Sequence, residues 1–143
     1  MKVYQTKDIR NIALVGAAKS GKTAISEAIM FESGLINRLG NVDDKNTVSD
    51  YRSIELSKQN SVSSTLLYAE HNNKKINILD TPGFPDYKGE VIAALNVADT
   101  AVVTVNAQNG PEIGTERYVN YAKDFASQML YYAKQYNFLP NVN

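Results

Sequence analysis

The stretch IALVGAAKSGKTAISEAIMF, from Ile12 to Phe31, restricts the fold of this chain more than any other segment. Its first part, Ile12 to Gly16, is short and apolar and ends in a glycine, which is typical of a buried strand. From Lys22 to about Phe31 apolar residues recur on one face of a helix, and Gly34 is a natural stop for that helix. A strand that leads through a glycine-containing loop into a helix predicts an α/β fold.

The loop between this strand and helix has the spacing GxxxxGK[ST], which is the P-loop pattern. Glycines let successive backbone N–H groups turn toward phosphate oxygens, and the N-terminus of the helix adds the positive end of its dipole. Lys22 would reach the β- and γ-phosphates as the catalytic lysine, and the Thr23 hydroxyl would ligate Mg²⁺. The alternative is a glycine-rich turn without a ligand. The predicted nucleotide-binding residues here are Gly16, Ala17, Ala18, Lys19, Ser20, Gly21, Lys22 and Thr23.

A second motif, DTPG, covers Asp80 to Gly83 and directly follows a predicted strand. A carboxylate at the C-terminal end of a strand lies where parallel α/β sheets bind ligands, so Asp80 would hold Mg²⁺ through water. Gly83 would bring its backbone N–H close to a γ-phosphate, as a further nucleotide-binding residue. The alternative is a surface turn. Kinases and most ATPases have no need of such a glycine, so the two motifs together favour a GTPase switch.

The remaining pattern predicts strands, helices and one long connector within a single domain, residues 1–143. The predicted elements are strands at about 62–70 and 75–79, a helix at about 87–97, a strand at 100–107 and a long amphipathic helix at 115–137. The turn HNNK would join the first two strands as an antiparallel hairpin, which leaves His71 on the surface. Residues 35–60 show little periodicity and exceed an ordinary connector, so this segment is either functional or disordered.

From Thr6 to about Glu116 the chain resembles the N-terminal G domain of translational GTPases, most closely that of elongation factor G and its ribosome-protection relatives. The resemblance rests on NIALVGAAKSGKT, NTVSDYRSIE, DTPGFPDYKGEV and DTAVVTVNAQNGPEIGTE, and it fades beyond Tyr121. It implies a three-layer P-loop fold whose mostly parallel sheet has one antiparallel hairpin strand. It also implies a switch that binds GTP or GDP with Mg²⁺ and acts at the ribosome in translocation. The implied segments are a P-loop at 16–23, switch I at 35–62 and switch II at 80–90.

Two positions in the implied switches depart from the family pattern. Counting from Asp50 and from Asp80 places Ser61 where the family has its Mg²⁺-ligating threonine, so Ser61 joins Thr23 and Asp80 as a predicted metal ligand. Phe84 stands where the family carries a histidine thought to position the attacking water. A phenyl ring offers neither a proton nor a hydrogen bond. Hydrolysis is therefore predicted to be slow, by a factor of roughly 10² to 10⁴. The alternative is that Phe84 packs against the following helix without consequence for turnover.

Base specificity is a further open question, because the chain contains no NKxD, the motif on the next strand that selects guanine in this family. The chain ends at FLPNVN, near where that strand is expected. A G domain that lacks its last strands is therefore predicted, as a fragment of a longer factor or as a truncated gene product. A non-catalytic nucleotide-binding module or remnant G domain is the alternative function.

Lys19 is unusual within the predicted P-loop. Many family members have an aspartate at this position, which is proposed to hold a monovalent cation beside the phosphates. We hypothesise that the Lys19 ammonium group replaces that cation and stabilises bound triphosphate. The alternative is a solvated lysine on a loop.

Composition sets the expected partners and location. Fifteen acidic residues balance fifteen basic residues, so charge predicts no membrane partner and no direct DNA binding. The absence of cysteine excludes disulfides and thiolate metal sites. The N-terminus, MKVYQTKDIR, is polar and does not resemble a signal peptide, and no apolar run approaches the roughly 20 residues of a membrane span. A cytoplasmic location is expected.

Overall fold

A five-stranded sheet in the order β2-β3-β1-β4-β5 organises the computed structural model, which describes residues 3–58, 60–126 and 128–134. Strand β1 pairs in parallel with both β3 and β4, β5 pairs in parallel with β4, and β2 runs antiparallel to β3. The strands are β1 (Ile9–Val15), β2 (Thr65–His71), β3 (Lys74–Asp80), β4 (Thr100–Asn106) and β5 (Gln128–Lys134). The predicted sheet, mostly parallel with one antiparallel hairpin strand, is confirmed.

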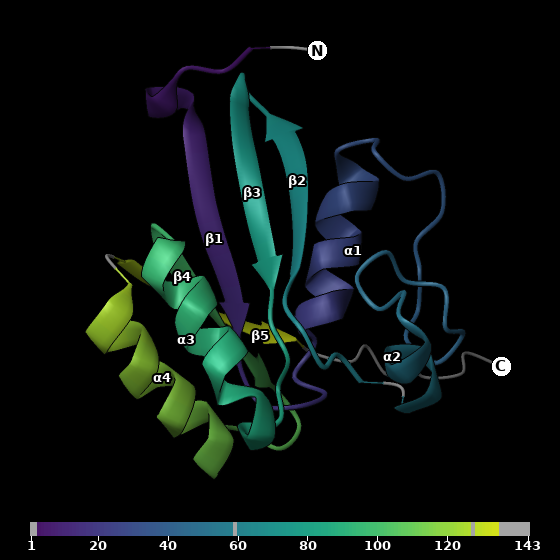
Figure 1. The fold of residues 1–143 in the computed structure, drawn as a ribbon, viewed down its shortest axis with the longest axis vertical. Helices are drawn as coiled ribbons and strands as arrows, with labels where there is room; N and C mark the ends of the chain where they lie inside the picture. Colours follow the sequence, from purple (N-terminus) through teal and green to yellow (C-terminus); the bar gives the residue numbers. More distant parts are fainter. Residues whose placement is uncertain (1–2, 59, 127, 135–143) are drawn as a thin grey trace, which may run out of the picture.

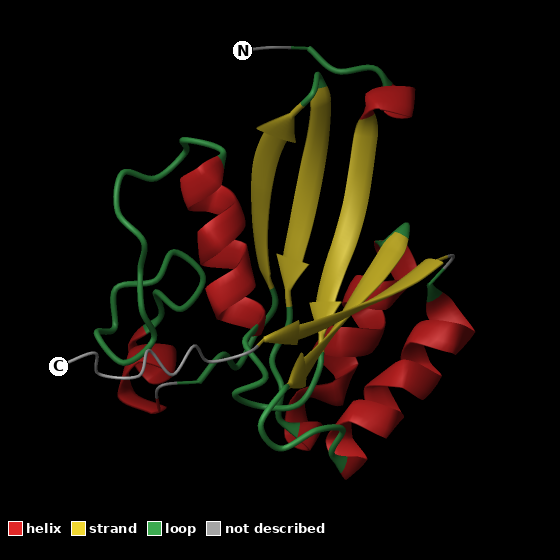
Figure 2. Cartoon of the chain, turned by 180° about the vertical axis from the view of Figure 1, so that it is seen from behind, coloured by secondary structure: helices red, strands yellow, loops and turns green. Residues whose placement is uncertain are grey.

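Helices cover both faces of the sheet and complete three layers (Figure 1). Helix α1 packs on one face, and α3 and α4 pack side by side on the other. Helix α2 lies in the long segment between α1 and β2, which runs beside α1 (Figure 2). The helices are α1 (Lys22–Glu32), α2 (Ser53–Lys58), α3 (Lys88–Val97) and α4 (Ile113–Phe125), with single 3₁₀ turns η1 (Thr6–Asp8) and η2 (Pro85–Tyr87).

The C-terminal end of strand β1 is buried on both faces, which fixes the position of the loop that follows it. Successive side chains of a strand point to opposite faces. Accordingly Ala13 and Val15 pack with Tyr118 under α3 and α4, whereas Leu14 packs with Met30 under α1. All three β1 side chains have no solvent exposure. The loop after Val15 therefore starts from a rigid strand end between two apolar layers.

The β2–β3 hairpin has the turn chemistry that the sequence predicts. Asn72 and Asn73 have φ of 47° and 59°. Positive φ at both central residues is the requirement of a type I′ turn, and asparagine tolerates it better than most residues. His71 pairs with Lys74 at the end of the hairpin and is exposed, as expected.

The long helix predicted from Thr115 to Asn137 is wrong beyond Phe125. Helix α4 ends there, Ala126 is extended (φ −96°, ψ 142°), and the residues from Gln128 form β5 along the open edge of β4. The aromatic run MLYY suits a strand as well as a helix, and pairing with β4 decides between them. Residues 135–137 of that prediction lie outside the described residues. The strand that was expected to begin near the end of the chain is thus β5, which begins earlier, at Gln128.

Candidate functional site

The loop between β1 and α1 is shaped by two glycines. Gly16 has a φ of 150°, and a Cβ added there would lie 2.5 Å from the backbone oxygen of Thr104 and 2.8 Å from the Ser20 Oγ. Gly21, directly before α1, has a φ of 100°. Residues with a Cβ rarely adopt either conformation, so the loop needs both glycines. The loop turns back over the sheet and leads straight into the N-terminus of α1.

The Lys22 side chain lies inside this loop. Its Nζ donates hydrogen bonds to the backbone oxygens of Gly16, at 3.0 Å, and Ala17, at 2.9 Å. Burial lowers the pKa of Lys22 from its ordinary 10.5 to about 8, against the opposing effect of Asp80 and then Asp50. The loop therefore encloses a buried amine whose positive charge a phosphate would stabilise.

Asp80 ends β3 next to this loop, and one of its carboxylate oxygens has no hydrogen-bond partner among the described residues. The Ser26 Oγ donates to Oδ2 at 3.2 Å, but Oδ1 is buried without a hydrogen bond to any described residue. Burial raises the pKa of Asp80, against the effects of the Ser49 hydroxyl, Lys22 and the Thr23 hydroxyl. An unpaired buried carboxylate oxygen is costly unless a ligand satisfies it. Asp80 thus has room for one more partner.

The donor set around Asp80 suits Mg²⁺ better than a transition metal. No three Asp, Glu or His side chains gather into a metal-binding group in the described part of the chain. Thr23 and Ser61 both line a cleft. The Thr23 hydroxyl acts on the Asp80 carboxylate, whereas the Ser61 hydroxyl donates to Asp50 at 2.6 Å. Mg²⁺ in nucleotide sites takes few protein oxygens and completes its shell with water and phosphate. The oxygen donors of Thr23, Ser61 and Asp80 are of the kind that Mg²⁺ takes, and their role as ligands stays a prediction.

Gly83 packs directly on the loop that follows β1. A Cβ at Gly83 would lie 2.6 Å from the backbone nitrogen of Ala18 and 2.6 Å from the Lys22 Nζ. Only a glycine therefore allows the segment after β3 to lie this close. The Tyr118 Oη of α4 donates a hydrogen bond of 2.9 Å to the Gly83 oxygen. This hydroxyl was missed in the sequence, where Tyr118 is only one of the apolar positions of α4.

A cleft of about 850 Å³ is lined by Lys22 and Thr23 of the loop and α1, by Ser61 and by Gly83. Phe84 lines it with 37% of its surface exposed, so the phenyl ring is not buried under the following helix. The exposed Lys19, with a φ of 62°, lies on the loop side of the same cleft. Its other walls include Leu39, Gly40, Asn41, Val42, Asp43, Thr47, Asp50 and Tyr132.

Buried glutamates hold the segment 35–62 against the rest of the fold. Glu27 of α1 accepts hydrogen bonds from the backbone nitrogens of Gly40, at 3.0 Å, and Val48. Glu55 of α2 has no exposed surface and accepts from the nitrogen of Val62 at 3.2 Å. These hydrogen bonds attach the described part of the segment to α1 and α2, and its role as switch I stays a prediction. In the sequence, the only indication that Glu27 has a structural role was an acidic residue on the inner face of α1.

The fold and the site together define a P-loop protein of the G-domain type. A loop with the P-loop spacing follows a central parallel strand, and an acidic residue ends the neighbouring strand. The chain belongs to the family described as "Elongation factor Tu GTP binding domain", whose model matches residues 7–133. This match continues through α4 into β5, beyond Tyr121, where the resemblance was expected to fade.

Similar proteins agree with this family. "Ribosome-releasing factor 2, mitochondrial" of Candida dubliniensis is 41% identical over 108 residues, which is 76% of this chain and 13% of that protein. The protein of the same name from Yarrowia lipolytica is 36% identical over 119 residues, 83% of this chain and 15% of its own length. A crystal structure from Thermus thermophilus superposes with a TM-score of 0.78 at 36% identity, over 81% of this chain and 18% of that one. The chain thus spans only 13–15% of the length of these two curated relatives.

None of the helices in the described part of the chain is long and apolar enough to cross a membrane.

Proposed function

We propose that this chain binds GTP or GDP with Mg²⁺ and serves as the G domain of an elongation factor G-like protein that acts at the ribosome. The observation that carries the proposal is that Lys22, Asp80 and Gly83, from two distant segments, meet at one glycine-shaped loop. The family supports a guanine nucleotide as the ligand. The names of the mitochondrial ribosome-releasing relatives support the ribosome as the partner.

Each residue of the site has a proposed role. The backbone of residues 16–23 cradles the phosphates, and Lys22 offsets the charge of the β- and γ-phosphates. The Thr23 and Ser61 hydroxyls would hold Mg²⁺ directly and Asp80 through water, and the ion would neutralise charge on the phosphate oxygens. The Gly83 N–H would bond to the γ-phosphate. Ser61 would have to exchange its hydrogen bond to Asp50 for the metal.

We further propose that GTP hydrolysis is slow in the isolated protein. Phe84 lines the cleft but can neither orient nor deprotonate a water molecule. The chain's only histidine, His71, is at the far end of the β2–β3 hairpin from Asp80. Asp86, in η2, is exposed and is the nearest acidic residue in sequence to Phe84. Unless Asp86 or a ribosomal group substitutes for the missing histidine, the protein acts mainly by binding its nucleotide.

The most specific parts of the proposal are the ribosomal step and the cellular location. Resemblance to elongation factor G supports translocation, whereas the names of the relatives favour ribosome release. A cytoplasmic location is proposed, and the same names give mitochondria as the competing one. Cell fractionation separates the two locations. Assays of peptide-chain translocation and of subunit splitting, run in parallel on ribosomes from each compartment, separate the two activities.

The alternative is a nucleotide-binding module without catalytic function, and the missing NKxD motif favours it. Titration with fluorescent GTP and ATP analogues in the presence of Mg²⁺ separates the two functions. A G domain should bind GTP more tightly than ATP. Equal and weak binding of both nucleotides would support the remnant and overturn the proposed guanine preference.

A further inference from the structure

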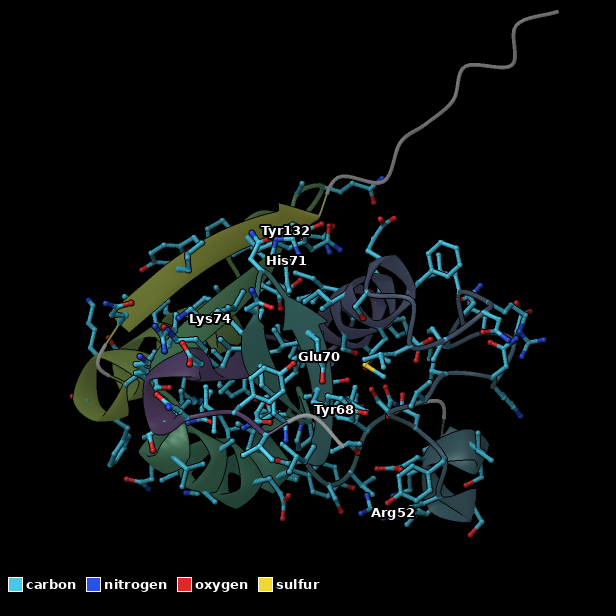
Figure 3. The ribbon with its side chains drawn as sticks, turned by 90° about the horizontal axis from the view of Figure 1, so that it is seen from above. Arg52, Tyr68, Glu70, His71, Lys74 and Tyr132 are labelled. Carbon is cyan, nitrogen blue, oxygen red and sulfur yellow. The ribbon has the colours of Figure 1, made fainter. Side chains whose placement is uncertain are left out.

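Strand β5 brings a second aromatic side chain to the cleft. Tyr132 lines the cavity with 41% of its surface exposed. Figure 3 labels this side chain at β5. Among the described residues, Phe84 and Tyr132 are the only aromatic side chains of the lining. Phe84 belongs to the segment that follows Asp80, whereas Tyr132 comes from the opposite edge strand of the sheet. The nucleotide site described above assigns no role to Tyr132.

The sheet register fixes the side to which Tyr132 points. Thr104 of β4 and Tyr132 of β5 are direct partners in the parallel pairing. Partners on neighbouring strands project to the same face, with backbones about 4.8 Å apart. The Thr104 Oγ1 contacts the Ser20 Oγ at 2.6 Å, so this face is the one that the phosphate-binding loop covers. The Tyr132 ring therefore lies on the same face as the loop, on β5, which is the strand next to β4 at the edge of the sheet.

The strand order also gives the cleft a direction. The C-terminal ends of β3, β1, β4 and β5 are neighbours in that sequence along one edge of the sheet. Asp80 ends β3, the loop follows β1, and Tyr132 stands near the end of β5. A ligand whose phosphates lie between the ends of β3 and β1 has its remaining part directed either toward β5 or out of the cleft.

We propose that Tyr132 is a stacking platform for the base of the bound nucleotide, an inference that rests on the proposed function. A half-exposed phenol ring beside a phosphate site offers a flat apolar face to a purine. Stacking of a base on an aromatic side chain depends little on the identity of the base. Tyr132 would thus add affinity for purine nucleotides without distinguishing guanine from adenine, in a chain that contains no NKxD motif.

Equilibrium titration of the full chain with GTP, ATP and inorganic tripolyphosphate, each with Mg²⁺, tests the inference. Tyr132→Ala should weaken GTP and ATP binding by about tenfold, and Tyr132→Phe should retain it, because the ring rather than the hydroxyl stacks. Tripolyphosphate binding should not change in either variant. Tyr131→Ala is the matched control, because Tyr131 is 58% exposed and lines a separate cavity against α4.

A second measurement does not depend on removing the ring. A 3-fluorotyrosine placed at position 132 should give a ¹⁹F resonance that moves on addition of GTP but not of tripolyphosphate. An unshifted resonance, or equal losses of GTP and tripolyphosphate in Tyr132→Ala, would overturn the role of Tyr132. If wild-type protein binds neither GTP nor tripolyphosphate, the proposed function fails as well. Normal GTP binding by Tyr132→Ala overturns the stacking inference alone.

Discussion

The hydroxyl of Tyr118 in α4 holds the backbone oxygen of Gly83 at 2.9 Å, which ties the segment after β3 to a helix of the opposite layer. The Tyr118 side chain is 2% exposed, and its hydrogen bond to Gly83 is partly buried. The position of Gly83 over the phosphate-binding loop thus depends on α4 as well as on β3.

Removing this hydroxyl should loosen Gly83 without changing the core. Tyr118→Phe leaves the Gly83 oxygen without its donor, which should lower the free energy of unfolding by about 1 kcal/mol. Urea unfolding measures the loss, and amide exchange of residues 83–87 should become faster. Tyr121→Phe is the control, because the Tyr121 hydroxyl makes no hydrogen bond within the described residues. Equal effects of the two variants would contradict the role of the Tyr118 hydroxyl.

Gly83→Ala should disturb the site directly. The added Cβ would lie 2.6 Å from the Ala18 nitrogen and from the Lys22 Nζ, so the loop or the segment after β3 must move. We expect GTP affinity to fall by at least about tenfold, which corresponds to about 1.4 kcal/mol. Gly89→Ala is the matched control, since no atom lies within 4 Å of a Cβ there and alanine favours the helix. Unchanged affinity in Gly83→Ala would show that the close packing is not needed for binding.

The lowered pKa of Lys22 predicts a pH dependence of stability in the nucleotide-free protein. Because the pKa falls from 10.5 to about 8 on folding, the unfolded chain binds the extra proton between these values. The free energy of unfolding should therefore rise with pH across this window, by an amount on the order of 3 kcal/mol. Urea unfolding at pH 7.5, 9 and 10 measures the trend. Lys22→Met should lack this component, and a wild-type slope equal to that of Lys22→Met would rule it out.

The ammonium group of Lys19 is predicted to take the place of a monovalent cation. Lys19 lines the cleft and is exposed, so its charge can reach bound phosphates. Lys19→Asp should bind GTP less tightly in buffer without Na⁺ and K⁺, and addition of K⁺ should restore the affinity. Asp tolerates the φ of 62° at this position better than most residues, so the loop should keep its shape. Indifference of the variant to both conditions would end the hypothesis.

Phe84→His should raise the rate of GTP hydrolysis if the missing histidine limits turnover. A positioned proton-transfer group is worth roughly 10² to 10⁴ in rate, and any gain should fall within that range. Phosphate release with and without ribosomes measures it, and Phe84→Ala controls for the loss of the ring. Rapid hydrolysis by the wild-type protein would refute the predicted impairment. An unchanged rate in Phe84→His would place the defect elsewhere.

Local spacing made the core of the site predictable from sequence. Gly16, Lys22 and Asp80 carry their geometry within short motifs, because a strand end and a helix start leave few other backbone paths. Tyr118 bonds to Gly83 and Tyr132 lines the cleft from β5, and both lie far in sequence from the loop, so no motif contains them. The sequence predicted a helix where β5 lies, because apolar residues there recur at three- and four-residue spacing. Pairing with the open edge of β4 is what favours a strand, and the sequence does not reveal that edge.

Asp80, Thr23 and Lys22 are proposed to form a GTP site that depends on Mg²⁺. Calorimetric titration of the full chain with GTP, in Mg²⁺ and then in EDTA, tests this dependence. We expect saturable binding that weakens when Mg²⁺ is removed, and Asp80→Asn should bind with little dependence on the metal. Absence of saturable GTP binding, or wild-type binding that is indifferent to Mg²⁺, would show that these residues do not form such a site.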